Sequence, residues 1–258
     1  MKRRSDVFLE PSRVSGCMNG QTFASSILNV PSGRAREFII YQQLYLGNIP
    51  EFLRTGIPIS VTAGKHAGVF WVMPDYLSIG DDEDFLRMPM RPTTAQKAAD
   101  GFKASLLTRK MVNDVWRALP LHLSPTTMDW HGAMASVSYF GEHNDKIQLQ
   151  LAGRDPLLGV AGHKKDVVIT KDRPKGNVAI YGWHQLDGKP IQGPQIQKSA
   201  HDIPYLDYSH GIRFANQTME VDGDTMYIVD VLQDEEYHEL LSDEGVYGPD
   251  DVRYPTEL

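Results

Sequence analysis

Cysteine is almost absent from this sequence, since Cys17 is the only one in 258 residues. A single thiol cannot form an internal disulfide, and it cannot build a thiolate metal cluster, which needs several cysteines at short spacing. The lack of disulfides fits a reducing compartment, so we expect a cytoplasmic protein by default. A periplasmic or secreted protein whose signal segment was removed would have the same composition, and that alternative stays open.

The chain also lacks an excess of positive charge. Its 26 Lys and Arg are outnumbered by 33 Asp and Glu, which gives a formal net charge of −7. Nucleic-acid binding depends on a basic surface that neutralises phosphates, so the composition argues against nucleic acid as the main partner. We expect a small-molecule or peptide substrate instead, and the sequence leaves the oligomeric state open.

Long apolar runs are missing as well. No stretch approaches the roughly 18 apolar residues that a membrane-spanning helix requires, and the basic start at residues 1–6 is not followed by the apolar segment of a signal peptide. Hydrophobic residues nevertheless make up 41% of the chain, which is typical of a globular protein with a buried core. The sequence predicts a soluble protein without a membrane span.

The periodicity of the apolar residues predicts most helices in the first half of the chain and most strands in the second. Helices are expected over residues 22–29, 34–46, 93–102, 107–118 and 234–241. Strands are expected over residues 57–62, 68–74, 167–170, 178–183, 218–221 and 225–231, and a long loop is expected over residues 185–206.

Strands and helices do not alternate regularly in this pattern. We therefore predict an α+β fold rather than a doubly wound parallel sheet. Residues 1–16 are polar and form an extended arm in this prediction. A single domain follows, with a helix-rich part at residues 17–150 and a mixed or antiparallel sheet at residues 151–258.

Four of the nine histidines lie between residues 162 and 213, in or between three short polar motifs. The first motif, residues 162–166 (GHKKD), precedes a predicted strand. There His163 can act as a base or a metal ligand, Asp166 can orient it, and Lys164 can hold an anionic group. The alternative is a solvated turn that leads into the strand.

The second motif, residues 181–184 (YGWH), ends the next predicted strand. His184 leaves this strand beside a glycine and Trp183, which gives backbone room and an aromatic wall, as in a ligand pocket. The alternative is a half-buried histidine whose ring is satisfied by a backbone carbonyl.

The third motif, residues 207–213 (DYSHGIR), holds an acid, a phenol, a hydroxyl, an imidazole and a guanidinium. Ser209 and His210 are neighbours, so their side chains diverge in an extended backbone. We therefore expect Ser209 to meet His184 or His163. Arg213 suits a carboxylate or phosphate of the substrate, with Tyr208 beside it, although a hydrogen-bonded turn packed on the core is the alternative.

A metal site is one chemistry that these motifs can support. His163, His184 and His210 would supply three ligands to zinc or a similar divalent ion, with Asp166 as a further ligand or a base. The chain has no HExxH motif or comparable short spacing, so the cofactor stays unknown and zinc is a candidate only.

A nucleophilic mechanism is the other option. Ser209 can pair with His184 and with Asp166 or Asp207, although there is no GxSxG motif around the serine. Cys17 precedes a predicted helix and comes before His184 in the order of papain-like enzymes. Neither arrangement has the spacing of a known catalytic motif.

Several stretches resemble an uncharacterised bacterial protein family, and this resemblance implies no activity. The stretches are residues 47–50 with 52–54, 74–77 (PDYL), 108–112 (TRKMV), 161–167 (AGHKKDV), 181–184 and 207–213. The segment around His184, followed by Ser209-His210-Gly211, is also similar to the motif order of L,D-transpeptidases. The nucleophilic cysteine of those enzymes is absent here, because Gly211 runs directly into Ile212.

Taken together, the motifs predict a hydrolase that acts on an ester or amide bond. In this hypothesis His184 is the general base, Ser209 is the nucleophile or a transition-state donor, and Arg213 holds an anion. His163, Asp166 and His210 orient these groups or bind a metal, and the resemblance to L,D-transpeptidases suggests cell-wall peptide as a substrate. The alternative hypothesis is a non-catalytic binding or structural module that uses the same polar pocket.

Overall fold

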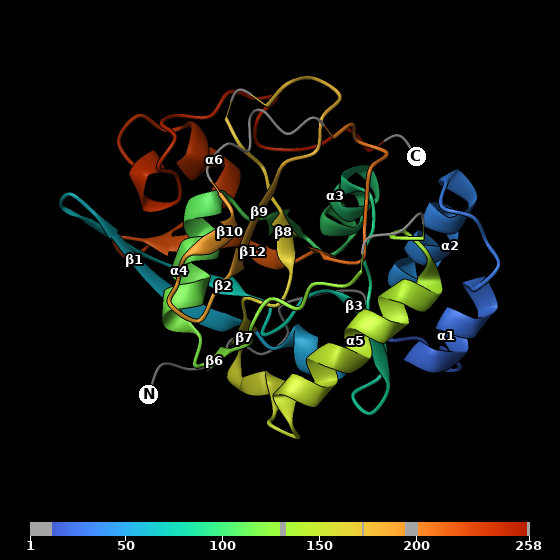
Figure 1. Ribbon diagram of the computed structural model, residues 1–258. Coiled ribbons are helices and arrows are strands. Elements are labelled where there is room, and N and C mark those ends of the chain that lie inside the picture. Colours follow the sequence, from blue (N-terminus) through green and yellow to red (C-terminus); the bar gives the residue numbers. More distant parts are fainter. Residues whose placement is uncertain (1–11, 130–132, 172, 194–200, 257–258) are drawn as a thin grey trace.

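The computed structural model describes residues 12–129, 133–171, 173–193 and 201–256 (Figure 1). Two larger sheets lie at the centre of the molecule, and helices surround them. Figure 1 shows α1 and α2 together at one side, α4 in front of the strands at the other side, and α5 across the lower front. The predicted α+β class is confirmed, since helices are present and the described strands pair mainly in an antiparallel way.

The larger sheet joins strands from both ends of the chain. Its order is β1 (Ile57–Ala63), β2 (His66–Val72), β12 (Phe214–Val221) and β13 (Asp224–Tyr227), and β5 (Ala104–Leu106) also pairs with β12. All of these pairs are antiparallel. The strand-rich part of the chain therefore completes a sheet that begins in the helix-rich part.

The second sheet brings the three polar motifs onto neighbouring strands. Its order is β10 (Pro190–Gln192), β9 (Ile180–His184), β8 (Lys165–Val167) and β11 (His210–Gly211). Asp166 on β8 is the antiparallel partner of Tyr181 on β9 and the parallel partner of Gly211 on β11. Residues that lie 15 and 45 positions apart in the sequence are thus placed side by side by backbone pairing.

Two short strand pairs complete the β structure that the described residues form. β3 (Ser78–Gly80) and β4 (Phe85–Arg87) make an antiparallel hairpin. β6 (Leu121–His122) runs parallel to β7 (Val160–Ala161). The second pair places the residues just before His163 next to the end of α4.

The helices are α1 (Gly20–Ile27), α2 (Arg34–Tyr45), α3 (Pro92–Gly101), α4 (Arg109–Ala118), α5 (Val137–Leu151) and α6 (Ile228–Gln233). Short 3-10 helices lie at η1 (Glu51–Arg54), η2 (Pro156–Leu158) and η4 (His238–Leu240). Asn19, Thr108 and Ser136 cap α1, α4 and α5 by accepting a hydrogen bond from a backbone N–H of the first turn.

Helix α4 positions part of the site. It buries Met111, Val112, Val115 and Trp116 and packs against β9. Asn113 and Trp116 are three residues apart, so they lie on neighbouring positions of the helix surface. Both side chains therefore reach the end of β9, where His184 lies.

Several boundaries differ from the sequence prediction. Residues 228–231 form helix α6 and not the end of a strand, because the burial of Ile228, Val231 and Leu232 follows a helical spacing that outweighs their strand propensity. The sequence pattern also missed α5, whose apolar positions are interrupted by polar residues. Strand β10 lies inside the predicted loop at 185–206. Of the predicted arm, residues 1–11 lie outside the described residues.

One large hydrophobic cluster fills the interior. It runs from Phe23 on α1 to Tyr254 near the C-terminus, and it includes Phe70 of β2 and Phe214 of β12. Its members come from both the helix-rich and the strand-rich parts of the chain. None of the helices in the described part of the chain is both long enough and apolar enough to cross a membrane.

Candidate functional site

The polar side chains of the three motifs are buried. The predicted site residues are at most 5% exposed: Trp183 5%, Tyr208 4%, Asp166 3%, His184 2%, Lys164, Ser209 and Arg213 1%, and His163 and His210 0%. A solvated turn would leave such groups in water, so the solvated-turn interpretation of residues 162–166 does not hold for His163, Lys164 and Asp166. Buried polar groups need partners, and those partners define what each residue can do.

His184 is held by an asparagine from α4. Its Nε2 lies 2.9 Å from Asn113 Oδ1, which also accepts a hydrogen bond from Tyr181 Oη at 3.1 Å. An amide oxygen only accepts, so Nε2 carries the ring proton and Nδ1 presents a lone pair. The indole of Trp116 stacks on the imidazole with ring centres 5.2 Å apart. The ring is thereby fixed in one tautomer and one orientation.

The protonation of His184 follows from this position. Burial is the main cause that lowers its pKa, to about 4, and the nearby charges of Arg117 and His122 lower it further. The imidazole is therefore neutral around pH 7. A neutral, oriented imidazole with a free Nδ1 can accept a proton.

Asp166 has the opposite shift. Its Oδ2 accepts a hydrogen bond from Tyr76 Oη at 2.8 Å. Burial raises the pKa of Asp166 to about 7, although the charge of Arg213 and the bond from Tyr76 act against the rise. A carboxyl group with this pKa carries its proton in slightly acidic solution and can donate it.

Arg213 contacts Tyr76 and two backbone carbonyls beside the cavity. Its guanidinium donates to the carbonyls of Met73 at 2.8 Å and Val160 at 2.6 Å, and it lies 4.4 Å from the ring centre of Tyr76. Two of its donors are thus used by the backbone. In this geometry Arg213 positions Tyr76 and fixes the start of β12, whereas the sequence led us to expect a contact with a substrate anion.

His184 and Asp166 line the same small cavity. Tyr76, Trp116 and Arg213 also line it, and apolar atoms of Val112, Val115, Ala161 and Gly162 close the remaining sides. The space open to the centre of a water molecule is ≈ 10 Å³, which is about what one water needs. A proton acceptor and a proton donor therefore face one water-sized space.

Two glycines of the motifs make this packing possible. A Cβ at Gly162 would lie 2.4 Å from Trp116 Cζ3, and a Cβ at Gly211 would lie 2.6 Å from Tyr76 Cδ1. Both distances are too short for real contacts. The aromatic walls of the cavity can therefore approach β8 and its neighbours only because these positions lack a side chain.

His163 belongs to a different cluster. Its Nε2 donates to Asp75 Oδ1 at 3.0 Å, and Arg87 donates to Asp75 Oδ2 at 2.6 Å. Burial would raise the pKa of Asp75, but Arg87 and His163 hold it well below its usual range. Burial lowers the pKa of His163 to about 4, with Asp75 acting against the shift. His163 hydrogen-bonds to the buried Asp75–Arg87 ion pair and does not line the cavity.

Lys164 and Tyr208, which were predicted to bind substrate, are bonded to the protein itself. Lys164 Nζ donates to the carbonyl of Tyr208 at 2.6 Å, and Tyr208 Oη accepts from the backbone N–H of Met128 at 3.0 Å. Burial lowers the pKa of Lys164 to about 7, and the charge of Arg87 adds to the effect. These residues connect β8 to the segment that precedes α5.

Ser209 meets Asp207 and not His184. Its backbone N–H and its hydroxyl both donate to Asp207 Oδ1, at 2.7 and 2.5 Å, while Tyr205 Oη donates to Oδ2 at 3.0 Å. An aspartate in a turn commonly binds the backbone two residues further on, and this local bond outcompetes the predicted pairing. A Ser209–His184 nucleophile pair is not formed, so the hydroxyl stabilises a turn.

The three histidines do not converge on a metal site. Among the described residues, no group of three or more His, Cys, Asp or Glu side chains is arranged to hold a metal ion. His163 faces Asp75, His184 faces Asn113, and the ring of His210 lies edge-on to Tyr205. The predicted zinc site of His163, His184, His210 and Asp166 is therefore not assembled.

Cys17 lies apart from these groups. Its thiol is directed to the carbonyl of Leu46 at 3.8 Å, beyond the end of α2. Within the described ranges, no hydrogen bond joins it to a histidine. The predicted pairing of Cys17 with His184 has no support in this geometry.

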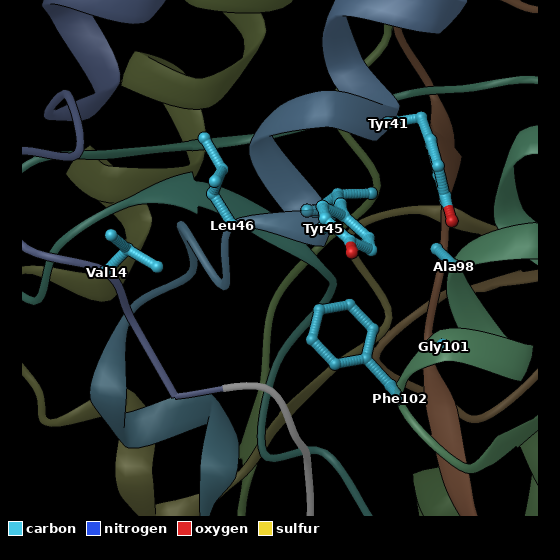
Figure 2. A pocket seen from close by; sticks show the side chains of 8 residues that line it. Val14, Tyr41, Tyr45, Leu46, Ala98, Gly101 and Phe102 are labelled. Atoms are coloured by element: carbon cyan, nitrogen blue, oxygen red, sulfur yellow. The ribbon is translucent and has the colours of Figure 1, made fainter.

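A larger groove in the N-terminal region has different chemistry. It has a volume of ≈ 390 Å³ and is lined by Val14, Leu46, Phe102 and neighbouring residues of α2 and α3. Figure 2 shows its wall as aliphatic carbons and aromatic rings, with the hydroxyls of Tyr41 and Tyr45 as its side-chain polar atoms. Its lining offers no carboxylate and no imidazole.

Comparison with known proteins adds no relative, because no family model, no curated protein and no solved structure matches this chain. The resemblances to an uncharacterised bacterial family and to L,D-transpeptidases therefore stay predictions.

Sequence reasoning missed the partners that define the site. Asn113, Tyr76 and Trp116 line or support the cavity, and Asp75 and Arg87 hold His163. Each of them lies on an element far from the motifs in the sequence. The one local signal is the spacing of Asn113 and Trp116 on the same helix.

Proposed function

We propose that this protein is a hydrolase that acts on an ester or amide bond with a water molecule as the nucleophile. The observation that carries the proposal is that His184 and Asp166 line one water-sized cavity. Their pKa values are shifted in opposite directions, to about 4 and about 7. Two titratable groups with divergent pKa values in one site are typical of a general base and a general acid.

In the proposed reaction His184 Nδ1 accepts a proton from the water as its oxygen attacks the carbonyl carbon. Asn113 keeps the proton on Nε2 and orients the resulting imidazolium. Asp166 then donates its proton to the leaving alcohol or amine as the carbon–oxygen or carbon–nitrogen bond breaks. Tyr76 donates to Asp166 Oδ2 and so leaves the other carboxyl oxygen to hold the transferred proton.

This mechanism changes the predicted roles of two residues. Ser209 is not the nucleophile, because its hydroxyl is bound to Asp207. Arg213 positions Tyr76 and influences Asp166 through its charge. The substrate is proposed to be a small molecule or a peptide, and cell-wall peptide is the narrower proposal that the resemblance to L,D-transpeptidases favours. We propose the cytoplasm as the compartment for a small-molecule substrate.

A second candidate is a non-catalytic module, and the burial of the site favours it. Lys164, Arg213 and Ser209 all use their polar atoms on other groups of the protein. Such a network would stabilise the fold without any reaction. The two proposals differ in the expected effect of replacing His184, since only a hydrolase loses turnover.

The test is a comparison of two histidines that contact the same indole. His184 and His122 stack on Trp116 with ring centres 5.2 and 3.8 Å away, but only His184 lines the cavity. Wild-type protein, His184→Gln and His122→Gln would be assayed on p-nitrophenyl esters and peptide p-nitroanilides. General acid–base catalysis contributes roughly 10²–10⁴-fold, so we expect His184→Gln to lose at least about 100-fold and His122→Gln to stay near the wild type.

Thermal unfolding of both variants would accompany the assays, so that a loss of fold is separated from a loss of chemistry. The proposal is contradicted if the wild type hydrolyses no member of the panel above the rate in buffer. It is also contradicted if folded His184→Gln turns over as fast as the wild type.

A further inference from the structure

His210 on β11 and Trp183 on β9 are buried polar side chains of the second sheet. Among the described residues, no group forms a hydrogen bond with either ring nitrogen of His210 or with the indole Nε1 of Trp183, although these two residues are 0% and 5% exposed. Buried polar groups are satisfied in the great majority of cases. A group that binds both residues from outside the chain would explain the exception.

The backbone brings these groups together with a lysine. Lys165 is paired with His210 across β8 and β11, so the two side chains leave the same face of the sheet. The Nζ atom of Lys165 lies 4.7 Å from the ring centre of Trp183. Trp183 has a φ of 54°, which is strained for a bulky side chain. In this backbone conformation the indole of Trp183 lies against the ammonium of Lys165.

The charges of the cluster leave Lys165 without a counter-ion. No ion pair or hydrogen bond to Lys165 Nζ is formed within the part of the chain that the structure describes. The carboxylate of Asp207, on which the charge of Lys165 acts, already accepts three hydrogen bonds from Ser209 and Tyr205. Lys165 is half-buried, so the cluster is connected to solvent along its side chain.

We infer that Lys165, Trp183 and His210 form a binding site for a carboxylate group. In the described part of the chain the ammonium and the indole N–H have no hydrogen-bond acceptor, and a neutral imidazole adds one further N–H. A carboxylate has two oxygens that can take these donors and a charge that matches the ammonium. Its source is a small organic acid or the C-terminus of a peptide.

This carboxylate site is independent of the proposed hydrolysis. Successive residues of a strand face opposite sides, so Lys165 lies on the other side of β8 from Asp166 and the cavity. Neither site shares a side chain with the other. A failure of the hydrolase proposal therefore leaves the carboxylate site to be judged by binding alone.

The test uses the four indole N–H signals of the wild-type protein in ¹H–¹⁵N NMR spectra. Trp71 also has a buried Nε1 without a hydrogen-bond partner in the described structure, which makes it a matched internal reference. We expect acetate to shift the Trp183 signal in a saturable way and to leave the Trp71 signal unchanged. Acetamide and sodium chloride at equal concentration should have no such effect.

Variants then assign the donors. Lys165→Met and Trp183→Phe each remove one hydrogen bond to a charged ligand, so each should weaken acetate binding about tenfold. Trp71→Phe should bind like the wild type. Dipeptides with a free or an amidated C-terminus distinguish the two sources of the carboxylate. A dipeptide with a free C-terminus that binds more tightly than acetate, while its amidated form does not bind, would indicate a peptide as the source.

The inference is overturned if acetate leaves the Trp183 signal unchanged, or if acetamide shifts it equally. Binding that persists at full strength in Lys165→Met overturns it too. The wild-type titration does not depend on the folding of any variant, so it tests the inference even if a variant fails to fold.

Discussion

Two buried polar clusters each contain a residue of the motif 162–166, and they differ in what their polar groups face. In the first, the carboxylate of Asp75 pairs with Arg87 at 2.6 Å and accepts a hydrogen bond from His163 at 3.0 Å. In the second, Asp166 and His184 face a small cavity and are held from behind by Tyr76 and Asn113. The two clusters contain similar residue types at similar burial.

The comparison teaches that burial alone does not mark a reactive group. A histidine that donates to a carboxylate is committed to that bond, as His163 is to Asp75. A histidine that donates to an amide keeps a free lone pair on its other nitrogen, as His184 does. We therefore expect the first cluster to stabilise the fold and the second cluster to transfer protons.

The largest expected effect is on the first cluster. Arg87→Met would leave the carboxylate of Asp75 buried without its main counter-charge, which typically costs about 3–5 kcal/mol. Arg253→Met is the matched control, because Arg253 pairs with Asp100 at 2.7 Å on the surface, where such pairs contribute roughly 0–1 kcal/mol. Urea unfolding measures both.

If both variants lost the same free energy of unfolding, the buried Asp75–Arg87 pair would contribute no more than an ordinary surface ion pair, which would contradict the prediction. A variant Arg87→Met that is too unstable to purify, beside a normal Arg253→Met, agrees with the prediction.

A smaller effect is expected at Asp166, and it depends on pH. Its folded-state pKa of about 7 lies above the ordinary value of 3.8. The stability from its bound proton is therefore fully present below about pH 4 and is lost as the pH rises towards 7. Asp166→Asn should lack this loss. The free energy of unfolding of the wild type should therefore fall by about 2–4 kcal/mol relative to that of the variant between these pH values.

The buried histidines have lowered pKa values and change stability in the opposite direction, because they lose stability as the pH falls through about 4. They are present in both proteins, so the difference curve isolates Asp166. Asp224→Asn, at an exposed position, serves as the control. Parallel pH curves for the wild type and Asp166→Asn would show that Asp166 is ionised throughout.

The sequence predicted where the site residues lie in the fold, but it did not predict which side chains they bind. It predicted the α+β class and placed His184, Asp166 and His210 at strand ends that the structure puts on neighbouring strands. It could not show that Asn113 binds His184 across 71 residues or that Tyr76 binds Asp166 across 90 residues. Such contacts depend on how α4 and the end of β2 pack on the sheet.

The prediction for Ser209 was wrong for a local reason. Alternation along an extended strand was used to direct its hydroxyl to His184 or His163. Residues 207–210 instead form a turn, in which His210 N–H donates to the carbonyl of Asp207. Within that turn the carboxylate of Asp207 is the nearest acceptor for Ser209.

The most direct test of the central claim is the protonation state of the two cavity residues in one sample. NMR of ¹⁵N-labelled histidine and ¹³C-labelled aspartate at pH 5.5, assigned with His184→Gln and Asp166→Asn, reports both groups. The account predicts a neutral His184 imidazole with its proton on Nε2 and a protonated Asp166 carboxyl group. An ionised Asp166, or a His184 imidazole that is protonated on both nitrogens, would contradict it.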